Sequence, residues 1–151
     1  MTDSISKKHR SWNMSRIKSV NTKPEVIVRS ILFKLGFRFR LNGKVSKKYS
    51  AKGKLPGKPD IVLAKYKTVI FVHGCFWHHH QGCKRATWPK SNKEYWIPKI
   101  ENNIIRDKEN IKKIEKLGWK IYIIWECEIN GNKLMKRINN IIHDMTRMDI
   151  R

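Results

Sequence analysis

The sequence contains few acidic residues. Only 12 of its 151 residues are Asp or Glu, against 34 Lys and Arg, so the formal net charge is +22. Such an excess favours a polyanionic partner, because neutralising phosphates releases their condensed counterions. Nucleic acid is the first candidate, and an anionic membrane surface is the second.

Long apolar runs and paired cysteines are also missing. No run reaches the ~18 apolar residues of a membrane span. The start, MTDSISKKHRSW, has no apolar segment, so we expect no signal peptide. Three cysteines are an odd number, and metal binding in a reducing cytoplasm fits them better than a disulfide framework.

The hydrophobic pattern predicts an α/β fold in a single domain. A basic arm over residues 1–21 precedes the domain, which we expect to cover 22–151. Strands are expected at FRFRL, DIVLAKY, TVIFV and KIYIIWE, the middle two as a hairpin and the last as a buried strand. Helices are expected over 22–36, 95–117 and 132–147. This order of helix, strands, helix, strand and helix favours an α/β sandwich.

Asp60 stands alone among cations. From Arg29 to Lys93 there are sixteen Lys or Arg residues, and Asp60 is the only acid. It could cap a turn or pair with a lysine. Alternatively, it could be a hard oxygen ligand for Mg²⁺, where a metal would lower the pKa of a bound water and neutralise a phosphate.

Two histidines follow the strand after Asp60. His73 ends that strand and His78 comes five residues later. Either imidazole could act as a general acid or base near neutral pH, although a loop histidine is usually a solvated side chain.

Cysteines and a histidine follow in the same loop. Cys75, His80 and Cys83 lie within nine residues, and Cys127 ends the last predicted strand. Strands ending at one edge of a sheet would bring them together as a closed, structural Zn²⁺ site. The alternative is three inert thiols, and the residues alone do not decide which of the histidines at 78–80 would be the ligand.

Aromatic side chains interrupt the same loop. Phe76 and Trp77 lie between Cys75 and the histidines, and Trp96 begins the 95–117 helix. In a basic chain they suit stacking on bases or wedging between them, with ordinary packing as the alternative.

Five stretches of the chain resemble the very-short-patch repair (Vsr) endonucleases, bacterial enzymes that nick DNA next to a T:G mismatch. They lie within residues 8–130 and read HRSWNMSRIKSVNTKPE, LPGKPDIVL, VIFVHGCFWHHH, EYWIPKIENNIIRD and LGWKIYIIWEC. The resemblance implies a restriction-endonuclease-like fold of the PD-(D/E)xK superfamily, with a central mixed sheet, flanking helices and a structural zinc site. That superfamily usually carries a second acid and a lysine on the strand after its Asp. TVIFVH has neither, which is characteristic of the mismatch-nicking family.

The resemblance also implies a role for each matching position. By resemblance, the Mg²⁺ ligands are Asp60 and the backbone carbonyl of Val72. The catalytic histidines are His73 and His78, and Glu25 orients a water at the metal. Glu25 also has capping-box spacing from Thr22. The family often has Thr at the position of Val72, a change that is harmless if only the carbonyl binds.

Further positions are implied for zinc and for DNA. The Zn²⁺ ligands are expected to be Cys75, His80, Cys83 and Cys127. The spacing CFWHHHQGC is one residue longer than the family pattern, and Gly82 can absorb the extra residue. The residues expected to enter the base stack are Phe76, Trp77 and Trp96, and those expected to contact the mismatched pair are Met14, Lys99 and Asn103.

These expectations together describe a Mg²⁺-dependent, strand-specific endonuclease that nicks double-stranded DNA beside a T:G mismatch. The alternatives are a non-catalytic, zinc-stabilised DNA-binding module and a restriction-type nuclease acting on undamaged DNA. We expect a bacterial, cytoplasmic, nucleoid-associated monomer, with mismatch-repair proteins as candidate partners and no membrane partner.

Overall fold

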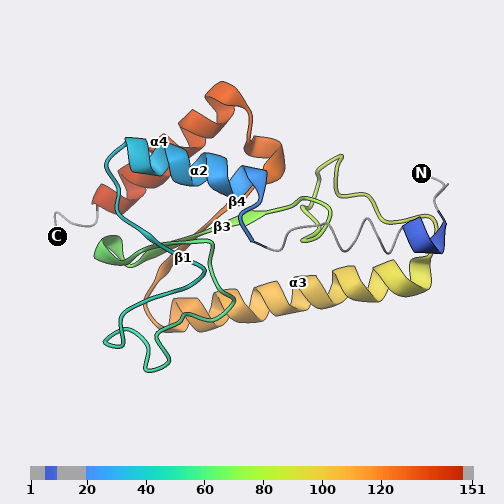
Figure 1. Ribbon diagram of the computed structural model, residues 1–151, viewed down its shortest axis with the longest axis horizontal. Helices are drawn as coiled ribbons and strands as arrows, with labels where there is room; N and C mark the ends of the chain where they lie inside the picture. The colour runs from blue at the N-terminus through green and yellow to red at the C-terminus, as the bar shows by residue number, and fades with distance from the viewer. Residues whose placement is uncertain (1–5, 10–19, 148–151) are drawn as a thin grey trace.

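The computed structural model describes residues 6–9 and 20–147 and contains a mixed four-stranded sheet between helices (Figure 1). The strands, in spatial order, are β1 (Arg40–Leu41), β2 (Ile61–Leu63), β3 (Thr68–His73) and β4 (Lys120–Trp125). Neighbours in β1–β2–β3 are antiparallel, and β3 and β4 are parallel. The helices are α2 (Lys23–Lys34), α3 (Lys93–Lys116) and α4 (Gly131–Arg147). The expected α/β arrangement is confirmed.

Side chains alternate between the two faces of this sheet. Ile70 and Val72 of β3 belong to the core formed with α2 and α4, whereas Val69 and Phe71 belong to the core that includes Ile114 of α3. Figure 1 shows α2 and α4 on one side of the sheet and α3 on the other. Because both faces are covered, the central strands are continuous apolar runs.

The helix α2 begins with a modified capping box. The hydroxyl of Thr22 accepts a hydrogen bond from the backbone N–H of Glu25 at 3.5 Å. The carboxylate of Glu25 accepts from the N–H of Asn21 at 2.9 Å, one residue before the expected position. This arrangement satisfies one backbone donor of the first turn, the N–H of Glu25, and a second on the residue before the cap, Asn21.

Three strands differ from expectation. FRFRL forms a strand only at Arg40–Leu41, which pairs with Val62 and Ile61 of β2, and Phe37 and Phe39 pack against the core instead. Only IVL of DIVLAKY is a strand, because AKY forms a short 3₁₀ turn, η1 (Ala64–Tyr66), between β2 and β3; the hairpin itself is confirmed. β4 lies at the edge of the sheet and is half-buried except at Ile124, so the prediction of a buried strand is wrong for most of its length.

No helix in the described part of the chain is both long enough and apolar enough to cross a membrane.

Candidate active site and metal centre

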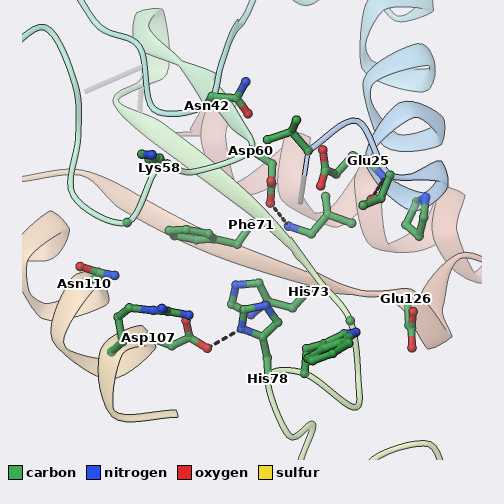
Figure 2. Close-up of a pocket in the computed structure, with 18 of the residues that line it drawn as sticks. Glu25, Asn42, Lys58, Asp60, Phe71, His73, His78, Asp107, Asn110 and Glu126 are labelled. Carbon is green, nitrogen blue, oxygen red and sulfur yellow. Dashed lines mark hydrogen bonds and ion pairs between the residues drawn. The ribbon is translucent and has the colours of Figure 1, made fainter. Parts of the chain in front are cut away.

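A cleft of about 910 Å³ lies beside the end of β3 (Figure 2). Its walls come from the start of α2, the loop before β2, the end of β3 and the middle of α3. The four side chains that the sequence analysis expects to be catalytic all line it: Glu25, Asp60, His73 and His78. The fold therefore brings together residues from three separate parts of the chain.

Asp60 lies where a charged carboxylate is unfavourable. Its Oδ2 accepts a hydrogen bond from the backbone N–H of Val72 at 2.7 Å. Burial raises the pKa of Asp60 to about 7, and the nearby negative charge of Glu25 adds to the effect. A cation bound at the carboxylate would remove this penalty. The carboxylate, the carbonyl of Val72 and the carboxylate of Glu25 are the oxygen donors that suit Mg²⁺.

Asp60 is isolated in sequence but not in space. Three other carboxylates line the same cleft: Glu25, Asp107 and Glu126. They lie on α2, on α3 and after β4, outside the interval in which Asp60 is the only acid. The description of Asp60 as a lone acid among cations therefore holds only along the chain.

His73 and His78 form a parallel stack. Their ring centroids are 3.8 Å apart and their planes differ by 4°. His73 is 6% exposed. Burial, and secondarily the neighbouring His78, lower the pKa of His73 to about 3, so His73 is neutral at pH 7 and suited to accept a hydrogen bond.

Asp107 is a functional candidate that the sequence analysis missed. Its Oδ2 lies 2.5 Å from Nδ1 of His78. It occupies the same face of α3 as Asn103 and Asn110. The other polar side chains of this face are cations or amides, so a single acid among them was the feature of the sequence that could have identified it. Asp107, His73 and His78 have donor atoms within 4.8 Å of one another. Because the stacked rings lie in parallel planes, their nitrogen lone pairs do not converge on one ion, and this trio suits proton transfer better than metal binding.

The four expected zinc ligands form a second cluster. The ligand atoms of Cys75, His80, Cys83 and Cys127 all lie within 4.8 Å of one another. Nδ1 of His80 is 3.6 Å from Sγ of Cys75 and 3.4 Å from Sγ of Cys127. A tetrahedral zinc ion with ordinary bond lengths separates such nitrogen and sulfur ligands by about 3.6 Å. The cluster is consistent with a closed, structural zinc site.

The structure decides which histidine joins the cysteines. His78 turns into the cleft, and His79 lies against Trp88 with ring centroids 4.4 Å apart, which leaves His80 with the thiols. Gly82 has φ +78°, a conformation in which glycine is not strained. The loop accommodates its extra residue at Gly82, and Cys83 lies with the other expected ligands.

Trp125 contacts both clusters. The ring of His80 stacks on it at 4.1 Å and 3°. His73 meets the same indole at 5.4 Å and 71°. One side chain at the end of β4 thus contacts both an expected zinc ligand and an expected catalytic histidine.

The aromatic residues expected to contact DNA gather beside the cleft. The rings of Phe76, Trp77 and Trp96 lie 5.5 to 5.6 Å from one another, and Trp77 also lines the cleft. Nζ of Lys99 lies 5.5 Å from the centre of the Trp77 ring, and the amide of Asn103 donates to the Trp77 carbonyl at 3.0 Å. Met14 lies outside the described residues.

Comparisons with known proteins place the chain in a family. Residues 2–85 match the family model described as DNA mismatch endonuclease Vsr. The chain belongs to the Vsr family of DNA endonucleases. The expected restriction-endonuclease-like fold and nicking-endonuclease class are thereby confirmed, and a non-catalytic binding module is not supported.

Similarity extends over nearly the whole chain. The type II nicking enzyme V.NmeAIP of Neisseria meningitidis is 44% identical over 146 residues, covering 96% of this chain and 97% of that protein. The type II nicking enzyme V.XorIIP of Xanthomonas oryzae pv. oryzae is 43% identical over 143 residues, covering 94% and 98%. The DNA mismatch endonuclease Vsr of Escherichia coli is 38% identical over 133 residues, covering 88% and 79%.

Proposed function

We propose that this nicking endonuclease is Mg²⁺-dependent and cuts one strand of duplex DNA beside a T:G mismatch. The main support for the proposal is that Trp77 both lines the cleft and belongs to the aromatic cluster. A base pair held open by these rings would lie next to the phosphate held at Asp60. A mismatched pair costs less to unstack than a matched one, so a wedge selects for it.

Asp60 and the Val72 carbonyl are the proposed Mg²⁺ ligands. When bound, Mg²⁺ supplies a water of lowered pKa and neutralises charge on the phosphate. Because Oδ2 of Asp60 accepts from the Val72 N–H, Oδ1 is the carboxylate oxygen that would face the cation. Glu25 accepts from the Asn21 N–H, which holds its carboxylate at the cleft, where it would orient the attacking water.

The two histidines divide the proton transfers. His73 is proposed to accept the proton of the attacking water; its low pKa makes it a weak base, so this transfer needs a water whose own pKa is lowered. His78, paired with Asp107, is suited to carry a positive charge and to protonate the leaving 3′-oxygen. The products would then be a 5′-phosphate and a 3′-hydroxyl.

Other parts of the chain have proposed roles in binding DNA and in stabilising the fold. The zinc cluster has four protein ligands and no open position, so its proposed role is structural. The basic arm over residues 1–21 is proposed to clamp the duplex beside the domain formed by 22–151, with Met14, Lys99 and Asn103 at the mispair. Nicking one strand needs one active site, so we propose a monomer.

A second candidate substrate is undamaged duplex DNA. The relatives with 44% and 43% identity are described as type II nicking enzymes, and these descriptions mention no mismatch. A restriction-type enzyme that nicks an intact site would use the same cleft chemistry. The names of these relatives thus favour this alternative, whereas the family description favours the mismatch.

Duplexes that differ only in one T:G or C:G pair separate the candidates. We expect single-turnover nicking of the T:G duplex in Mg²⁺, none after Mg²⁺ is withheld, and none with Asp60→Asn. Equal nicking of both duplexes would establish the undamaged substrate instead. Retained nicking by Asp60→Asn would overturn the proposed site, whichever duplex is cut.

A further inference from the structure

Three cationic side chains line the cleft, and they differ in their contacts with the described residues. Lys99 donates to the hydroxyl of Tyr95 at 3.1 Å, and Arg106 donates to Oδ1 of Asn103 at 2.7 Å. Lys58 makes no hydrogen bond or ion pair with any residue that the structure describes. Its ammonium group can therefore bind a ligand without breaking a contact with the described residues.

The backbone holds Lys58 in an unusual conformation. Its φ is +49°, in the left-handed region that lysine rarely adopts, and this costs about 1 kcal/mol or more. Such conformations persist only where the surroundings enforce them, and they cluster at functional sites.

Two glycines provide the surroundings that hold this turn. A Cβ on Gly43 would lie 3.0 Å from Cα of Lys58, and a Cβ on Gly57 would lie 2.9 Å from Cβ of Asn110 on α3. Gly43 also donates its N–H to the carbonyl of Pro59 at 2.7 Å. The turn is thus clamped between a neighbouring loop and α3, and it carries Lys58 at a defined place.

The position of Lys58 suits a phosphate bound at Asp60. The two residues are separated only by Pro59, and both line the cleft. Figure 2 shows Lys58 and Asp60 above Phe71, with His73 and His78 below it. The strand β3 carries no lysine or arginine, so a cation that contacts the phosphate must come from another element.

We propose that the ammonium group of Lys58 binds a non-bridging oxygen of the scissile phosphate and stabilises the negative charge that builds up there in the transition state. This inference rests on the proposed function, which puts that phosphate beside Asp60. The water oxygen bonds to phosphorus as the bond from phosphorus to the 3′-oxygen breaks. One proton leaves the water, one reaches the 3′-oxygen, and Lys58 keeps its own proton throughout.

The chain contains a matched control for this residue. Lys67, in the turn before β3, is also left-handed, with φ +46°, but does not line the cleft. Glycine relieves the backbone strain at both positions and removes one charge from each. The variants Lys58→Gly and Lys67→Gly should therefore melt at or above the wild-type temperature.

Single-turnover nicking at saturating enzyme tests the role directly, on the T:G duplex or on whichever of the two duplexes the wild type cuts. We expect Lys58→Gly to be about 10²-fold slower, Lys58→Arg to recover most of the rate, and Lys67→Gly to match the wild type. A rate for Lys58→Gly within about threefold of wild type would overturn the inference, as would an equal loss in Lys58→Arg.

Binding without turnover gives a second readout. In Mg²⁺-free buffer, the plot of log affinity against log salt should become shallower by about 0.9 for Lys58→Gly and stay unchanged for Lys67→Gly. An unchanged slope for Lys58→Gly would mean that the side chain is only solvated. Asp60→Asn separates the two proposals: if it still nicks, the site itself is wrong, whereas an inactive Asp60→Asn beside a fully active Lys58→Gly rejects only the role of Lys58.

Discussion

Asp107 on α3 holds His78, which lies 29 residues earlier, through a contact of 2.5 Å between Oδ2 and Nδ1. With Nδ1 engaged, His78 has Nε2 as its other nitrogen in the cleft, and its ring face lies on His73. A carboxylate in this position selects one tautomer and stabilises the protonated imidazole. We propose that Asp107 acts on the chemistry through His78, as a positioning residue.

Replacing Asp107 by Asn should slow nicking without unfolding the protein. The amide keeps the shape of the side chain but cannot stabilise the charged imidazole, so we expect a loss of about 10²–10⁴-fold in the single-turnover rate. Glu101→Gln, an exposed change on the same helix, should leave the rate unaltered. A wild-type rate in Asp107→Asn would contradict the assignment.

Asp60→Asn should stabilise the Mg²⁺-free protein at alkaline pH. The folded state raises the pKa of Asp60 from 3.8 to about 7, so the folded chain binds this proton more tightly than the unfolded chain. The resulting stabilisation is complete below about pH 4 and is lost as the pH rises through about 7.

Thermal melts of the zinc-loaded protein measure this difference. Wild type and Asp60→Asn should melt at similar temperatures near pH 4. At pH 8 the variant should melt several degrees higher, with an upper limit of about 4 kcal/mol in the free energy of unfolding. Added Mg²⁺ should raise the melting temperature of the wild type only. A constant difference across this pH range would show that Asp60 is not buried as described.

His80→Ala should lose zinc, whereas His79→Ala should retain it. The two residues are adjacent, but only His80 has Nδ1 near the thiols. Metal analysis should find about one zinc per chain in the wild type and in His79→Ala, and markedly less in His80→Ala. The loss of zinc should lower the melting temperature, because binding at a structural site contributes to folding. Full zinc content in His80→Ala would show that another side chain is the ligand.

Trp77→Ala should weaken the discrimination between T:G and C:G duplexes. Each base stacked on an aromatic ring contributes about 1–3 kcal/mol, so its loss should cost roughly 5- to 150-fold in binding or rate on the preferred duplex. Trp88→Ala removes an indole that is 44% exposed, lies outside the cluster and does not line the cleft. It should keep the wild-type preference. An unchanged ratio of the T:G and C:G rates in Trp77→Ala would show that Trp77 does not select the mismatch by wedging between bases.

The elements of the fold were largely predictable because local rules produce them. Thr22, Glu25 and Gly36 bound α2 through capping and termination, and the repeated apolar positions from Leu134 to Met145 define α4. The length of β1 was not predictable. It depends on which residues of β2 lie opposite it, which is a property of two strands and not of either one.

Within the site, the residues that the sequence could predict were those that lie close together along the chain. His73, Cys75, Trp77 and His80 lie within eight positions of one another, so one strand and one loop deliver all of them whatever the rest of the chain does. Their residue types already indicated a metal site beside an acid–base site. The histidine ligand remained open among three neighbours, because only the path of the loop turns one of them toward the thiols.

The sequence alone was enough to single out Asp60 and the crowded loop after β3 as candidates, because Asp60 is the only acid in its interval and the loop residues are neighbours along the chain. Only the tertiary structure decided that Asp107 holds His78, that burial, with Glu25 nearby, raises the pKa of Asp60, and that Trp125 contacts both clusters. These partners lie on α2, α3 and β4. Their contacts depend on how those elements pack around the sheet, and packing is set by buried surfaces rather than by separation along the chain.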